Sequence, residues 1–157
     1  MDRLAVEKAK ELHRRHPGLS FPVDMEWLAD AEGCELVNWP FLSPVKEVKR
    51  GRYIGLAEGL RIKERRYLAA HALAHQLLHC GNQLFFYDWD KTITWKQERE
   101  ANECAAHILM PEEVLRKLRN ESTWDLAEYF GVPELLVRLR VSEFATDREL
   151  AHWQCLC

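Results

Sequence analysis

The sequence predicts an α+β domain in which a small antiparallel sheet packs on a helical core, with further helices at the C-terminus. Three observations favour this class. Residues 34–62 alternate between apolar and polar in short segments, as strands do. Most of the remaining chain shows the three-to-four-residue apolar spacing of helices. The chain has 157 residues, of which 47% are hydrophobic, and this is enough for one buried core.

The N-terminal part is expected to form two helices. Residues 2–15 are amphipathic, and the His-Pro-Gly sequence that follows ends this helix. A short helix is expected over residues 25–31, because Asp24 is a favoured N-cap residue and Gly33 a favoured terminator.

Short strands are expected next. Residues 34–39 alternate like a strand, and residues 45–49 and 52–57 flank an Arg-Gly pair that suits a hairpin turn. Residues 59–62 are expected to form a short last strand. The sheet is therefore predicted to be small and antiparallel.

From residue 64 onward the pattern is helical, interrupted by a long aromatic loop over residues 82–94. Residues 64–80 are alanine-rich and apolar on nearly every side, so this helix is expected to be buried. Further helices are expected over residues 95–110, 111–119, 123–130, 133–140 and 144–153. We divide the chain into a domain of residues 1–120 and a C-terminal helical subdomain, residues 121–157, packed on it.

Charge and cysteine content favour a cytoplasmic protein. The net charge of −3 gives no bulk attraction to nucleic acid or to an anionic membrane. No apolar run approaches the ~20 residues that span a bilayer, and the N-terminus has no apolar signal core. The five cysteines form no C-x-x-C pair, and their odd number indicates reduced thiols.

Two histidines in the predicted buried helix point to a metal site. His71 and His75 lie four residues apart, so they share one helix face and suit one metal ion. In the zinc-protease signature H-E-x-x-H, the second position carries the glutamate that acts as general base. Here Ala72 occupies that position. On spacing alone, two core histidines bonded to backbone carbonyls remain an alternative.

The predicted helix 95–110 offers glutamates for the third ligand that a catalytic zinc site needs. Glu98 lies about 50° from the direction of the apolar face of this helix, Glu100 about 110° and Glu103 nearly opposite. Glu98 is therefore the acid that best faces the core. Asn102 points the same way one turn later, and we expect it to accept a hydrogen bond from a ligand histidine.

The arrangement of H-x-x-x-H on one helix and E-x-x-A-N on the next is similar to that of the gluzincins, the thermolysin-like enzymes. With their flanking residues, the segments 67–79 and 98–111 resemble the ImmA/IrrE family of metallo-endopeptidases. The resemblance implies a zincin-type helical core and one catalytic Zn²⁺ ion held by His71, His75 and Glu98. It also implies a protein substrate, a helix-turn-helix transcriptional repressor of a bacterium or its mobile element.

Ala72 stands where this family has its catalytic glutamate. Loss of a general base typically costs ~10²–10⁴-fold in rate, so we expect the chain to be nearly inactive as a peptidase. Two interpretations remain open. An engineered knockout is favoured, because all three ligands are retained. The alternative is a natural pseudo-protease that regulates by binding a repressor or DNA. A purely structural zinc protein is a weaker, third interpretation.

Other side chains are candidates near the site. His79 continues the histidine stripe, but its rise along the helix makes it a poor fourth ligand. His107 is expected either to support the site or to be structural, and Tyr87 either lines a substrate cleft or covers the core. Because an edge strand holds an extended substrate in active zincins, residues 52–57 are the candidate strand.

Residues 125–140 have the spacing of a helix-turn-helix pair. The second helix carries Glu134 at the end that would read bases, and only Arg138 and Arg140 farther along. We therefore expect structural packing or protein docking rather than DNA binding.

Overall fold

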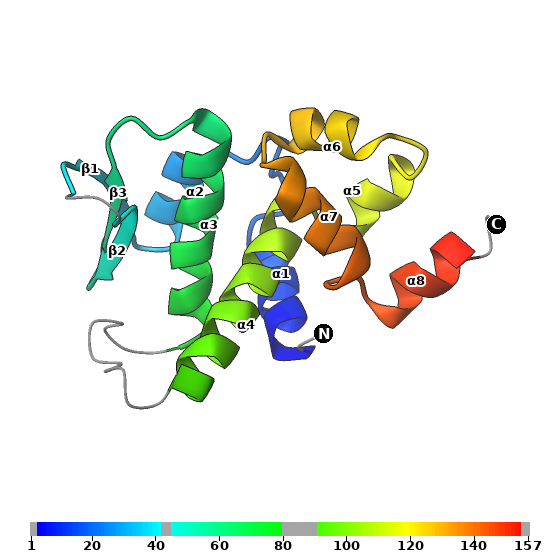
Figure 1. The fold of residues 1–157 in the computed structure, drawn as a ribbon, viewed down its shortest axis with the longest axis horizontal. Coiled ribbons are helices and arrows are strands. Elements are labelled where there is room, and N and C mark those ends of the chain that lie inside the picture. Colours follow the sequence, from blue (N-terminus) through cyan, green and yellow to red (C-terminus); the bar gives the residue numbers. More distant parts are fainter. Residues whose placement is uncertain (1–2, 42–44, 80–90, 155–157) are drawn as a thin grey trace.

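The computed structural model describes residues 3–41, 45–79 and 91–154, excepting the side chains of residues 91–94 and 153–154. The α+β class is confirmed: the helices lie on one side of a small sheet at one end of the molecule (Figure 1). In chain order the elements are α1 (Arg3–Arg15), α2 (Met25–Ala31), β1 (Glu35–Trp39), β2 (Glu47–Arg50), β3 (Tyr53–Ala57), α3 (Ile62–Leu78), α4 (Lys91–Leu109), α5 (Glu112–Lys117), α6 (Thr123–Phe130), α7 (Glu134–Ser142) and α8 (Asp147–Gln154).

The sheet has the strand order β1-β3-β2. β2 and β3 form the predicted antiparallel hairpin, with Val48 opposite Gly55. β1 runs parallel to β3, with Leu36 opposite Ile54, so the prediction of a purely antiparallel sheet is wrong. The reason is the path of the chain, which leaves β1, forms β2 at the far edge and returns as β3 in the centre.

The strand predicted over residues 59–62 is also wrong. Gly59 lies in a turn with a φ of 76°, and α3 already begins at Ile62. Four alternating residues are too few to separate a strand from a turn that leads into a helix. By contrast, α2 has the predicted bounds, and the Asp24 side chain accepts a hydrogen bond from the backbone N–H of Trp27.

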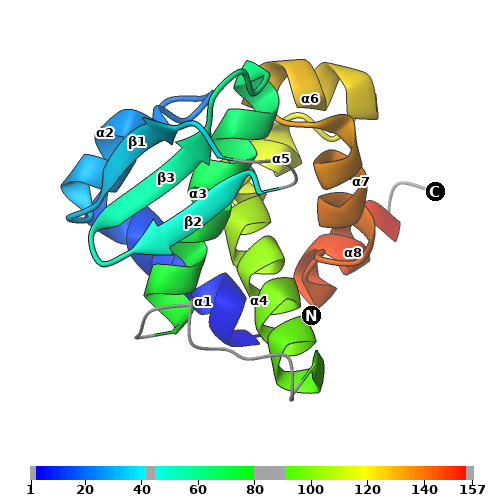
Figure 2. The same cartoon turned by 60° about the vertical axis from the view of Figure 1, so that its left-hand side comes forward.

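α3 lies between the sheet and α4, as Figures 1 and 2 show from two directions. Its middle, residues 69–75, is buried throughout. Four of these seven residues are alanines, whose small side chains let the neighbouring elements approach closely. The sequence therefore places a helix with few bulky side chains where both layers meet.

α1 packs along α4, and the Nε2 atom of His13 donates a hydrogen bond to the carbonyl oxygen of Ile108 at 2.9 Å. Because α4 has neighbours on more than one side, Glu103 is fully buried, although its helical phase places it away from the apolar face. Helical phase selects a single buried direction, whereas α4 is buried on more than one side.

The helices α5 to α8 lie on the other side of α4 from the sheet (Figure 1). Ser122 caps the start of α6, and Gly131, with a φ of 59°, ends that helix in the left-handed conformation. The division into two domains at residue 120 stays a prediction. No helix in the described ranges is long and apolar enough to cross a membrane.

Candidate metal centre

His71 and His75 bring two imidazoles together on one face of α3. Their side chains are 11% and 3% exposed, and the ring centroids lie 4.7 Å apart. The four-residue spacing produces this proximity, because side chains one helical turn apart stand above each other. Both rings are therefore held in a poorly hydrated layer beneath the sheet.

Glu98 reaches this pair from α4. One carboxylate oxygen lies 3.2 Å from Nε2 of His71, and the other lies 3.0 Å from Nε2 of His75. The structure thus brings together the three residues that the sequence selects from two separate helices. The Glu98 side chain is 47% exposed, so the cluster is open to solvent on the side of α4.

The donor set fits a zinc ion. The ligand atoms of His71, His75 and Glu98 all lie within 4.8 Å of one another. Tetrahedral zinc with bonds of about 2.0–2.1 Å places its ligand atoms roughly 3.3 Å apart, close to the separations of Glu98 from the two histidines. Two imidazole nitrogens and one carboxylate are also a ligand set of catalytic zinc sites, which leave one position free for water or substrate.

The charges of the cluster are strongly coupled. Burial opposes a charge on His71, but hydrogen bonds and Coulomb interactions with Glu47 and Glu98 outweigh it and raise the pKa of His71 to about 9. Hydrogen bonds with His71 and His75 hold the pKa of Glu98 well below its usual range, although partial burial opposes this. Without a metal, these residues therefore hold an anionic carboxylate beside a protonated imidazole.

Glu47 is a member of the site that the sequence did not reveal. It lies on β2, and its Oε2 atom is 2.9 Å from Nδ1 of His71, on the side of the ring away from Glu98. Glu47 is one of many charged residues in its region, and no motif marks it. Only the packing of β2 on α3 brings it to the cluster, and that packing depends on contacts distant in sequence.

Asn102 belongs to the hydrogen-bond network of the site through Tyr67. Its side-chain oxygen accepts a hydrogen bond from the hydroxyl of Tyr67, and the hydrogen bond that we expect from a ligand histidine stays a prediction. The Tyr67 ring lies beside that of His71, with centroids 6.0 Å apart. Burial, together with the nearby carboxylates of Glu47 and Glu98, raises the pKa of Tyr67 to about 12, so the phenol keeps its proton.

Ala72 and His79 lie on α3 and at its end. Ala72 directly follows His71 and is fully buried, and its methyl group offers no acceptor for a proton. Nε2 of His79 lies 3.6 Å from a carboxylate oxygen of Glu100, so His79 faces a different acid from the other two histidines. Its exclusion from the ligand set stays a prediction.

His107 is not brought to the cluster. Its Nε2 atom donates a hydrogen bond to the carbonyl oxygen of Phe144 at 2.7 Å, and it is buried among the C-terminal helices. Nine residues separate His107 from Glu98 on α4, which is about 13 Å along the helix axis. Of the two predicted roles, this placement favours the structural one. Tyr87 lies outside the described residues.

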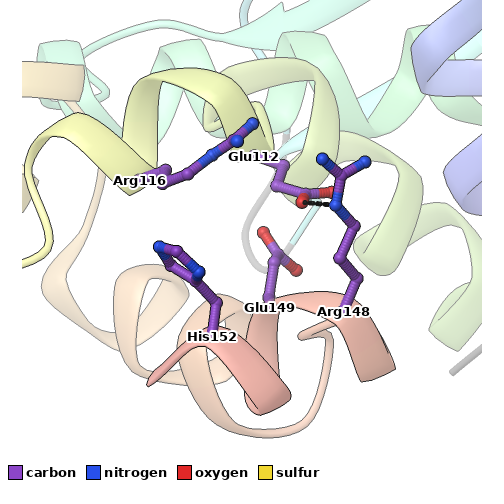
Figure 3. A pocket seen from close by; sticks show the side chains of 5 residues that line it. All are labelled: Glu112, Arg116, Arg148, Glu149 and His152. Carbon is purple, nitrogen blue, oxygen red and sulfur yellow. Dashed lines mark ion pairs between the residues drawn. The ribbon is translucent and has the colours of Figure 1, made fainter. Parts of the chain in front are cut away.

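Two hollows lie away from the metal centre. A cavity of about 630 Å³ lies between α1, the segment after it, and the helices α5 and α8. A smaller pocket of about 30 Å³ between α5 and α8 is shown in Figure 3, where Arg148 pairs with Glu112 at 3.4 Å. Its lining carries charges of both signs, and none of the three candidate zinc ligands lines either hollow.

Comparison with known proteins gives a family. A profile described as the IrrE N-terminal-like domain matches residues 32–142, a segment that contains Glu47, His71, His75 and Glu98. The uncharacterized immunity region protein 2 of Bacillus phage phi105 is 35% identical over 95 residues. This alignment covers 59% of the present chain and 60% of that relative, so the chain spans less than two thirds of its length.

A solved structure shares the fold. A Mycobacterium tuberculosis transcriptional regulator superposes with a TM-score of 0.68 at 16% sequence identity. The superposition covers 92% of the present chain and 48% of the regulator. At this identity the likeness concerns the fold alone.

Proposed function

Because the chain belongs to the IrrE N-terminal-like domain family of metallopeptidases, we propose that it is a zinc-dependent peptidase domain that acts on a helix-turn-helix transcriptional repressor. The observation that carries the proposal is the convergence of His71, His75 and Glu98 from two helices. The name of the phage relative, which refers to an immunity region, supports a regulatory substrate.

His71, His75 and Glu98 would hold the metal, and the 47% exposed side chain of Glu98 places their cluster beside solvent. Bound zinc supplies Lewis-acid chemistry, which polarises a peptide carbonyl group and acidifies water. Glu98 would contribute a negative charge that partly offsets the charge of the ion. Tyr67 keeps a protonated phenol beside His71, held in place by its hydrogen bond to Asn102.

Ala72 limits the chemistry that the chain performs. A methyl group neither takes a proton from water nor passes one to the leaving amine. We therefore propose that the domain binds zinc and substrate but cleaves at a rate about 10²–10⁴-fold below that of a glutamate-containing form. His71 and Glu47 do not replace the base in this proposal, because they are hydrogen-bonded to each other.

The test restores the base. Ala72→Glu is compared with Ala72→Gln, because glutamine has nearly the size of glutamate but no basic carboxylate. The substrate is the helix-turn-helix repressor encoded nearest to the gene. We expect Ala72→Glu to raise the cleavage rate by about 10²–10⁴-fold and Ala72→Gln to leave it unchanged. Cleavage is read by intact mass. No cleavage by a folded, zinc-loaded Ala72→Glu protein would contradict the proposed peptidase function.

The sheet supports a site for an extended substrate, but not on the predicted strand. Residues 52–57 include β3, which is the central strand, so its backbone hydrogen bonds are used on both sides and the prediction is wrong. β2 lies at the edge and also carries Glu47 next to His71. We propose that a substrate segment adds to β2, so that its scissile bond lies at the metal centre.

DNA is a poorer partner for this chain. Of the two cations expected on the second helix of the pair, Arg140 is fully buried and bonded to Glu149. Arg138 is paired with Glu134 at 2.9 Å. Both contacts reduce the positive charge that the helix can offer to phosphates, which supports protein docking over DNA binding.

A second candidate function is a non-enzymatic regulator that binds a repressor without cutting it. Ala72 favours it, because the ligands are retained while the base is absent. The same experiment separates the candidates. A regulator would bind the repressor tightly in both forms and would cleave it in neither.

A further inference from the structure

We propose that Glu47 is a positioning residue for the metal centre, which holds His71 in the orientation and tautomer that zinc requires. The inference rests on the proposed zinc-binding function and deepens it. No sequence motif assigns this role, and it follows from the contacts of Glu47 across the boundary between the sheet and α3.

The two nitrogens of the His71 ring face two different carboxylates. Nδ1 lies 2.9 Å from Oε2 and 3.3 Å from Oε1 of Glu47, while Nε2 lies 3.2 Å from Glu98. A neutral imidazole has one N–H donor and one lone-pair acceptor. A carboxylate can only accept, so Glu47 selects the tautomer with hydrogen on Nδ1, which leaves the lone pair of Nε2 free for a metal.

Burial makes this selection effective. The side chains of His71 and Glu47 are 11% and 15% exposed, so little water competes for either group. A hydrogen bond from a ring N–H to an ionised carboxylate is among the stronger hydrogen bonds in proteins. It restricts rotation of the ring, and it makes the opposite nitrogen a better electron donor toward a cation.

The backbone fixes the position of Glu47. It is the first residue of β2 and lies opposite Leu56 of β3, and Leu56 is fully buried. The carboxylate is thus presented by a paired strand and not by a free loop. Since β2 is also the sheet edge beside the site, Glu47 links the orientation of a zinc ligand to the strand that we propose for substrate binding.

The experiment compares two variants of nearly equal size. Glu47→Gln keeps an oxygen that accepts the Nδ1 hydrogen, whereas Glu47→Met removes it. Glu35→Met, on the opposite edge strand, controls for removing a carboxylate from the sheet. Zinc affinity is measured by competition with a chromophoric chelator, and the visible spectrum of the Co²⁺-substituted protein reports the ligand geometry. Thermal unfolding of the metal-free proteins identifies variants that fail to fold.

We expect Glu47→Met to weaken zinc binding by about 10–100-fold and to change the Co²⁺ spectrum. The zinc affinity and Co²⁺ spectrum of Glu47→Gln should lie closer to those of the parent, and those of Glu35→Met should match the parent. Equal affinities for Glu47→Met and the parent would overturn the inference, and so would a Glu47→Gln protein as weak as Glu47→Met. A folded parent that binds no zinc would instead overturn the proposed function, so the two failures are distinguishable.

Discussion

Two groups of buried ionisable side chains lie toward different ends of α4, and they differ in how their charges are satisfied. At the C-terminal end of α4, Arg140 is fully buried. Its guanidinium donates hydrogen bonds to the carboxylate of Glu149 at 2.9 Å and to the carbonyl oxygen of Met110 at 3.0 Å. Glu149 also accepts from the backbone N–H of Thr146. Each charge there is satisfied by groups of the protein itself.

At the metal centre, two imidazole nitrogens converge on one carboxylate that is half exposed. A closed pair such as Arg140–Glu149 needs no ligand, whereas the Nε2 atoms of His71 and His75 and the carboxylate of Glu98 converge on one point beside solvent. Burial of charge alone therefore does not mark a functional site. A functional cluster differs by having donors that converge where a further atom can bind.

Removing one partner of the closed pair should have the largest effect on folding. Arg140→Met leaves Glu149 buried without its partner, so we expect a loss of about 3–5 kcal/mol in the free energy of unfolding, measured with urea. The double variant with Glu149→Met should recover most of this loss, because neither charge then remains buried. If the single and the double variant lost the same free energy of unfolding, the assignment of Arg140 and Glu149 as a pair that satisfies its own charges would be contradicted.

Zinc should stabilise the protein through the open cluster only. At a free zinc concentration about 100-fold above the dissociation constant, the parent should gain about 2.7 kcal/mol, seen as a rise in the unfolding midpoint. Glu98→Ala should lose this gain, while its metal-free form should stay folded. The matched variant Glu143→Ala, an exposed glutamate, should keep the gain. Full zinc stabilisation of Glu98→Ala would show that the ion binds elsewhere.

The two regions should respond to pH in opposite directions in the metal-free protein. The pKa of His71 is raised from 6.5 to about 9. Its contribution to the free energy of unfolding is therefore complete below pH 6.5 and is lost as the pH rises through 9. Burial, and then the charge of Arg140, lower the pKa of His107 from 6.5 to about 3. That contribution is present above pH 6.5 and is lost as the pH falls toward 3.

Urea unfolding between about pH 3 and pH 9 tests how the free energy of unfolding changes with pH on both sides. His71→Gln should flatten the alkaline side of the stability profile, and His107→Gln should flatten the acid side. Burial opposes a charge on Glu149, but the hydrogen bond and charge of Arg140 outweigh it and lower the pKa of Glu149. Glu149 therefore adds to the loss of stability at low pH, in the same direction as His107. The assignment to His107 would be contradicted if His107→Gln lost stability with falling pH as steeply as the parent does, at pH values above those where carboxylates titrate.

The smallest effect concerns a helix cap far from the metal. The Ser122 hydroxyl oxygen accepts a hydrogen bond from the backbone N–H of Asp125 at 3.1 Å. Ser122→Ala should cost about 1 kcal/mol of stability, measured with urea, and leave zinc affinity unchanged. Ser142→Ala, at the exposed end of α7, should stay within about 0.5 kcal/mol of the parent. A change in zinc affinity in Ser122→Ala would mean that the two regions are coupled.

Local signals explain what the sequence could predict. Asp24 and the residues after it specify α2 by a capping interaction that needs no distant contact. The hairpin of β2 and β3 is likewise local. The choice of Glu98 over its neighbours used helical phase and a motif, and the structure places Glu98 against both histidines.

Long-range contacts explain what the sequence could not predict. The parallel pairing of β1 with β3 depends on where the chain crosses the sheet, which strand patterns do not record. Glu47 reaches His71 only through the packing of β2 on α3. Arg140 is a basic residue in a helix that resembles a DNA-reading helix, but α8 folds back and pairs with it. In each case the partner lies in a different element.

Metal analysis of the purified protein tests the central claim most directly. After dialysis against buffer with zinc and then without it, the parent should retain one zinc ion per chain, and Glu98→Ala should retain none under the same conditions. Circular dichroism confirms that both proteins are folded. A folded parent without zinc, or a Glu98→Ala protein that keeps it, would contradict the metal centre proposed here.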